Sequence, residues 1–147
     1  MREALKEAHK AYQKEEVPVG AVLVLHHKVI ARGYNQVEML KDATAHAEML
    51  CMGSGTVALE NWRLLDTTLY CTIEPCAMCA GAMFLSRIKR LVWGAPDLRH
   101  GANGSFFDLF TLKHPTHKIE VTPKVMAEEC SSMMQEFFRE RRNKTTS

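Results

Sequence analysis

Three side chains that favour soft divalent metals stand in two short segments of the chain. His46 lies in the first segment, and Cys76 follows it by 30 positions, with Cys79 three residues further on. On a helix, residues at i and i+3 share one face, so both sulfurs would reach one ion. Three protein ligands leave a fourth position for water, which is typical of catalytic rather than structural zinc sites. The spacing therefore predicts a zinc centre that activates water.

Glu48 is the candidate base beside this centre. Two thiolates and a neutral imidazole offset the charge of zinc, so its water is acidified less than on a zinc held by histidines alone. A nearby carboxylate would help to remove a proton. Positions 46 and 48 lie about 200° apart on a regular helix, so we expect Glu48 to reach the water from the side without binding the metal.

The cysteine pair also has other interpretations. A C-x-x-C pair occurs in dithiol redox sites, and it can form half of a structural zinc site that needs a fourth ligand. Cys51, Cys71 and Cys130 are available for that role. Cys71 lies in a predicted strand and the other two on apolar helix faces, so we expect all three to be small buried hydrophobes.

Other polar residues are given structural roles. Glu74 stands just before a predicted helix start, where a carboxylate is a favourable partner of the helix dipole. His100, His114 and His117 have no spacing typical of metal ligands, so we expect them at the surface.

The hydropathy pattern predicts the elements that position these residues. Helical spacing predicts helices over residues 4–12, from about 46 to 53 or 55, 76–85, and 126–138. β-rich runs predict strands over residues 20–25, 29–34, 67–73, 90–93 and 118–122, the first two as a hairpin. His46 and Cys76 thus fall at helix N-termini, whose partial positive charge favours thiolates. This order predicts an α/β fold, a mixed sheet with helices on both faces.

Length and composition predict one folded domain over residues 1–147. Hydrophobic residues make up 46% and charged residues 24%, values that exclude a disordered or collagen-like chain. Neither a signal peptide nor a membrane span is evident, and five cysteines argue against a disulfide framework, so we expect a cytoplasmic protein. The net charge is only +2, but residues 87–100 and 139–147 each hold four basic residues and one acidic residue. A phosphate-bearing partner would suit these two basic windows.

Two strings identify a family. His46-Ala47-Glu48 and Pro75-Cys76-Ala77-Met78-Cys79 match the known H-x-E and P-C-x-x-C signature of zinc-dependent nucleoside and nucleobase deaminases. Over nearly its whole length the chain resembles the bacterial tRNA-specific adenosine deaminases. The strings that carry this resemblance lie at residues 16–22, 44–48, 62–66, 69–83, 87–88, 104–105 and 137–139.

The resemblance implies a three-layer α/β/α cytidine-deaminase-like fold with a mixed five-stranded sheet, assembled as a homodimer. It implies conversion of adenosine to inosine at the first anticodon position of tRNA. One zinc ion per subunit would be held by His46, Cys76 and Cys79, and Glu48 would shuttle protons. Of the residues expected to touch the anticodon stem-loop, Asn35 matches a base-contacting Asn, Asp97 an acidic residue at the anticodon backbone, and Phe138 an aromatic near the loop.

Two alternatives stay open at this point. A free-base guanine or cytosine deaminase would share the zinc chemistry, but it would not need the basic tail at residues 139–142 or the loop around Asp97. A non-catalytic zinc or RNA-binding module would use Glu48 only as a helix-start carboxylate. Replacing Glu48 separates this second alternative from an enzyme.

Overall fold

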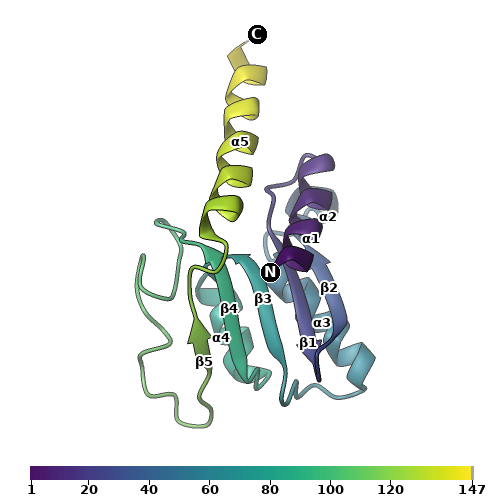
Figure 1. The fold of residues 1–147 in the computed structure, drawn as a ribbon, viewed down its shortest axis with the longest axis vertical. Coiled ribbons are helices and arrows are strands. Elements are labelled where there is room, and N and C mark those ends of the chain that lie inside the picture. The colour runs from purple at the N-terminus through teal and green to yellow at the C-terminus, as the bar shows by residue number, and fades with distance from the viewer. Residues whose placement is uncertain (147) are drawn as a thin grey trace.

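A five-stranded mixed sheet forms the centre of the computed structural model, which describes residues 1–146 (Figure 1). The strands are β1 Gly20–Leu25, β2 Lys28–Tyr34, β3 Thr68–Ile73, β4 Arg90–Ala95 and β5 Glu120–Thr122. Their spatial order is β2-β1-β3-β4-β5. β1 pairs antiparallel with both β2 and β3, whereas β4 pairs parallel with both β3 and β5. The predicted mixed five-stranded α/β sheet is confirmed.

Helices cover both faces of this sheet. They are α1 Arg2–Gln13, α2 Val37–Leu40, α3 Ala47–Leu59, α4 Ala77–Leu85 and α5 Ala127–Thr146. α1 and the first turns of α5 lie on one face, and α3 and α4 lie on the other, so the molecule has three layers (Figure 1). Among residues 1–146, no helix is both long and apolar enough to cross a membrane.

α1 packs unusually close to β1. Its buried residues include three alanines, Ala4, Ala8 and Ala11, whose small side chains let the two backbones approach. A Cβ atom added at Gly20 would overlap the carbonyl oxygen of Ala4 and the backbone nitrogen of Ala8. Gly20 is therefore required by the contact between the helix and the strand.

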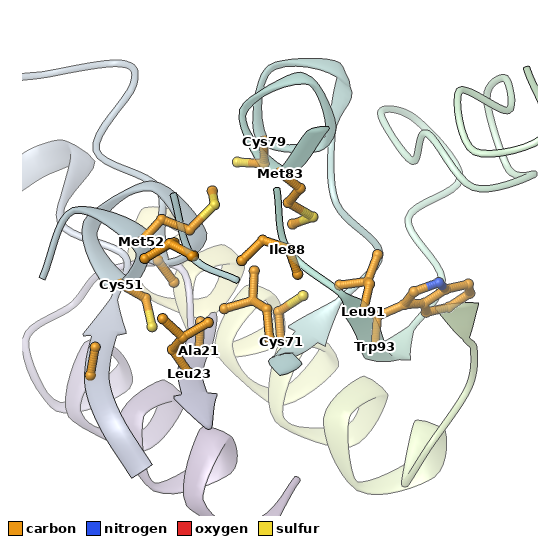
Figure 2. Close-up of a cluster of buried hydrophobic side chains, with 14 of the residues drawn as sticks. Ala21, Leu23, Cys51, Met52, Cys71, Cys79, Met83, Ile88, Leu91 and Trp93 are labelled. Carbon is orange, nitrogen blue, oxygen red and sulfur yellow. The ribbon is translucent and has the colours of Figure 1, made fainter. Parts of the chain in front are cut away.

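Sulfur-containing and aliphatic side chains fill the core between β1, β3, β4 and the helices α3 and α4 (Figure 2). Cys51 and Cys71 are fully buried within it, and Cys130, in the first turn of α5, is 2% exposed. Burial raises the pKa of the Cys51 thiol to about 12. The prediction that these three cysteines are buried hydrophobes is confirmed.

The predicted end of the second long helix is wrong. α3 continues through Gly53 and Gly55 and ends at Leu59. Gly55 lies against the side chain of Leu23 in β1, where an added Cβ would crowd the leucine methyl group. This glycine therefore serves helix-to-sheet packing and does not stop the helix. The short α2 helix was not predicted from the sequence.

Three strands end at the same edge of the sheet. Tyr34, the last residue of β2, pairs with Gly20 at the start of β1, and Ile73 and Ala95 are paired at the ends of β3 and β4. The segments that follow β2, β3 and β4 therefore leave the sheet side by side. In open α/β sheets, ligands bind beyond such carboxyl ends.

Candidate metal centre and its surroundings

His46, Cys76 and Cys79 converge at this edge, as the sequence predicted. His46 is the N-cap residue of α3 and Cys76 that of α4, so two helix N-termini meet here. His46 Nδ1 lies 3.6 Å from Cys76 Sγ and 3.5 Å from Cys79 Sγ, and all three donor atoms lie within 4.8 Å of one another. A tetrahedral ion with zinc–ligand distances of about 2.0–2.3 Å has a nitrogen-to-sulfur edge of about 3.5 Å. The donor set therefore fits zinc in both chemistry and spacing.

Hydrogen bonds within the set favour a thiolate. Bonds from Cys79 and from His46 lower the pKa of the Cys76 thiol to about 3, although burial opposes this shift. The bond that Cys79 makes to Cys76 raises the pKa of Cys79, and burial raises it further. The bond to Cys76 also raises the pKa of His46. The pair thus holds negative charge at two positive helix ends, which suits a cation.

Glu48 lies beside the donor set without belonging to it. It sits in the first turn of α3, is 2% exposed, and its carboxyl shares a hydrogen bond with Cys79. Burial is the main cause that raises the pKa of Glu48. Burial stabilises the neutral form of a carboxyl, which can then return a proton as well as accept one. Its predicted approach to a metal-bound water from the side stays a prediction.

Asn35 follows β2 directly and stands next to the start of α3. Its backbone N–H donates to Val19, and the N–H of the following residue, Gln36, donates to the carbonyl of Ala45 at 3.0 Å. Ala45 immediately precedes His46, so this bond holds the segment after β2 beside the start of α3. Asn35 is 8% exposed, and its Oδ1 has no hydrogen-bond partner among the described residues. A buried acceptor left open in this way can receive a bond from a substrate.

Asp97 lies in the loop that follows β4 and is half-buried. Its Oδ1 accepts hydrogen bonds from the backbone N–H groups of Arg99 at 3.1 Å and His100 at 3.2 Å. The side chain thus closes a turn of its own loop. Its predicted contact with an anticodon stays a prediction.

Phe138 lies in the second half of α5. This helix extends beyond the sheet (Figure 1). Phe138 is 42% exposed, whereas the neighbouring Phe137 is 4% exposed and packs edge-on against Tyr12 of α1, with ring centroids 5.7 Å apart. Phe137 therefore fixes the helix, and Phe138 faces solvent.

Two buried carboxylates have roles that the sequence did not predict. Glu16 was not singled out, and Glu74 was interpreted only as a helix-dipole partner. Glu16 accepts bonds from the backbone N–H groups of Glu38 and Met39 and so fixes α2. Glu74, interpreted above as a helix-dipole partner, instead accepts four bonds from the loop that carries Asp97. The one sequence signal at Glu74 is its place directly before Pro75 and Cys76.

The surface placement of three histidines is correct for only one of them. His100 is exposed, but His114 stacks on Phe84 with ring centroids 4.8 Å apart. His117 lies 2.7 Å from the carbonyl oxygen of Ile88 through its Nε2. Both are half-buried because they attach the segment between β4 and β5 to the core.

Comparison with known sequences gives the family and its relatives. The family profile of the cytidine and deoxycytidylate deaminase zinc-binding region matches residues 1–95. The chain is 48% identical over 144 residues to the tRNA-specific adenosine deaminase of Bacillus subtilis, which covers 98% of this chain and 89% of that protein. It is 52% identical over 154 residues to the chloroplastic tRNA(adenine(34)) deaminase of Arabidopsis thaliana, covering 94% of this chain but only 12% of that longer protein.

A solved structure from a study of A-to-I editing by tRNA:A34 deaminases at the wobble position has the same fold. Its TM-score is 0.81 at 41% sequence identity, and the match covers 88% of this chain and 94% of that one. The predicted cytidine-deaminase-like architecture is thereby confirmed.

Proposed function

The chain belongs to the zinc-binding cytidine and deoxycytidylate deaminase family, and from this membership we propose that it is a tRNA-specific adenosine deaminase. In this reaction water replaces the 6-amino group of adenosine at the first anticodon position, which yields inosine and ammonia. The observation that carries the proposal is a buried carboxyl, Glu48, set against a complete three-ligand donor set. Similarity to tRNA adenosine deaminases over almost the whole chain supports the substrate.

His46, Cys76 and Cys79 hold one zinc ion per subunit in this proposal. When bound there, zinc supplies a Lewis acid that lowers the pKa of a water molecule. Hydrogen bonds from Cys79 and His46 favour the thiolate of Cys76, and the contacts of both sulfurs with Nδ1 orient the imidazole of His46.

Glu48 moves the protons of the reaction. It takes one proton from the attacking water and delivers it to ring nitrogen 1, and it then passes the second proton of that water to the amino group, which leaves as ammonia. Because the carboxyl is buried, its neutral form is stabilised, and so it can donate as well as accept.

Asn35, Asp97 and Phe138 bind the anticodon stem-loop. The open Oδ1 of Asn35 accepts a hydrogen bond from the purine, while Asp97 and Phe138 contact the surrounding loop. The exposed ring of Phe138 is available for stacking on an unpaired base.

The proposal extends to the assembly. Residues 1–147 act as one deaminase domain, and two copies form a homodimer in the cytoplasm. Sedimentation of the purified chain tests this stoichiometry, and a monomer at micromolar concentration would contradict it.

Nucleoside mass spectrometry tests the activity. Unmodified tRNA transcripts are incubated with the zinc-loaded protein and with its Glu48→Ala variant, and inosine is read at the first anticodon position. We expect inosine with the wild-type protein only, while zinc content stays the same in both.

Free guanine and cytosine are offered to the same samples. Release of ammonia from a free base, without inosine in any tRNA, would replace the proposal by a free-base deaminase. Failure of every substrate in the zinc-loaded protein would favour a binding module.

A further inference from the structure

Glu74 is a buried carboxylate that the proposed reaction does not use. It is 1% exposed and stands between Ile73, the last residue of β3, and Pro75. Its backbone N–H donates to the carbonyl of Ala95 at 2.8 Å, at the end of β4. The residue therefore lies at the junction of the two parallel strands, one peptide away from the turn that presents Cys76.

Four donors from one loop converge on this carboxylate. We define the 96–105 loop as the residues that follow β4. Oε1 accepts bonds from the N–H of Asp97 at 3.2 Å and from the hydroxyl of Ser105. Oε2 accepts bonds from the N–H of Asn103 at 2.8 Å and of Ser105 at 3.2 Å. The N–H of Ala102 adds a bond to the carbonyl of Pro75 at 2.8 Å.

Gly101 completes the enclosure of the carboxylate. A Cβ atom at this position would overlap the carboxylate carbon and both oxygens of Glu74. The loop backbone thus closes directly over the charged group, and this approach is possible only for glycine.

The four bonds leave the oxygens of Glu74 little capacity for a further partner. An ionised carboxylate has about four lone-pair positions, and four donors occupy them here. Such bonds to a charged acceptor are roughly twice as strong as neutral ones. These bonds can hold the 96–105 loop in one conformation before a substrate binds.

We propose that Glu74 is a positioning residue that holds the 96–105 loop in register with the Cys76 turn, so that the loop meets the tRNA already ordered. The other face of the loop is exposed: Leu98 is 80% exposed, and Arg99 and His100 also face solvent. Because the loop is ordered in advance, binding does not have to supply the free energy of ordering it. The role in substrate binding rests on the function proposed above, whereas the ordering of the loop does not.

The variant Glu74→Gln tests the proposal by hydrogen exchange. A glutamine keeps the volume but replaces one acceptor oxygen by an NH₂ group, which cannot accept. We expect the amides of Asp97, Asn103 and Ser105 to exchange at least about tenfold faster, because their bonds to a charged acceptor are lost or weakened. Amides of β3 and β4 should keep their protection. Unchanged exchange at all three loop amides would overturn the proposal.

Kinetics give the second readout. We expect KM for a tRNA transcript to rise roughly tenfold while kcat and zinc content change little, since the loop contributes binding and not chemistry. A loss confined to kcat would show that Glu74 acts in the reaction instead. If the wild-type protein forms no inosine, the proposed function fails, but the exchange experiment still decides the role of Glu74.

Two further variants guard against misfolding and against a non-specific charge effect. Ser105→Ala removes only the hydroxyl donor, so it should shift loop exchange and KM in the same direction by a smaller factor. Glu120→Gln, an equal change on the exposed start of β5, should alter neither. If Glu74→Gln does not fold, Ser105→Ala decides: unchanged loop exchange in that variant would overturn the proposal.

Discussion

The side-chain NH₂ group of Asn35 donates to the backbone carbonyl of Val17 at 3.2 Å, and this bond fixes the orientation of the amide. If the amide were flipped, Oδ1 of Asn35 would lie against the carbonyl oxygen of Val17, and two acceptors would be in contact. The buried Oδ1 is therefore the end of the side chain that is left for a partner.

Replacing Asn35 by Ala should lower kcat/KM for tRNA by roughly tenfold to a hundredfold, because a buried donor on the purine would lose its acceptor. Zinc content should not change. Single-turnover assays over a range of enzyme concentrations measure the effect, with Gln36→Ala as the neighbouring control. An unaltered kcat/KM in Asn35→Ala would remove this residue from the substrate site.

Replacing Cys79 by Ala should abolish stoichiometric zinc, because two ligands cannot hold the ion as three do. Cys71→Ala is the matched control: it also removes a buried sulfur but should keep about one zinc per chain, at a cost of about 1 kcal/mol in the free energy of unfolding. Metal analysis by mass spectrometry checks both variants. Equal zinc loss in both would show that the sulfur atoms act through stability alone.

Replacing Gly20 by Ala should lower the free energy of unfolding by about 3 kcal/mol, because the new methyl group must push the α1 backbone away from β1. Gly53→Ala is the control, since an added Cβ meets nothing within 4 Å at this position inside α3. It should raise stability by about 0.5–1 kcal/mol. Urea unfolding measures both, and similar midpoints would contradict the close approach of α1.

Binding of tRNA should weaken steeply with salt if the basic windows contact phosphates. Each phosphate neutralised contributes about −0.7 to the slope of log K against log [salt] for single strands. Arg139→Ala, in the exposed half of α5, should reduce the slope by about that amount. Lys28→Ala, at the opposite edge of the sheet from the metal centre, should leave it unchanged. A flat salt response of the wild-type protein would exclude an electrostatic interface.

The sequence predicted the metal centre because its signals are local. The spacing of Cys76 and Cys79 and the helix starts at both ligand segments follow from neighbouring residues alone. The role of Glu74 could not be predicted in the same way. Three of its four donors are backbone N–H groups 23 to 31 positions away, and every residue except proline carries such a group. The glycine of α3 at position 55 was misinterpreted for a related reason, since its partner Leu23 lies on another element.

The hydrogen bonds that hold the 96–105 loop come mostly from its main chain. The backbone that fixes the loop and the side chains on its exposed face can therefore be changed independently. Side chains that point outward, such as Leu98 and Arg99, can be exchanged without removing any donor to Glu74. Ser105 and Gly101 are the positions to keep. Variants randomised at the outward positions should therefore differ in the nucleic acids they bind while the loop backbone keeps its conformation. The residues of the metal centre would be the same in every variant.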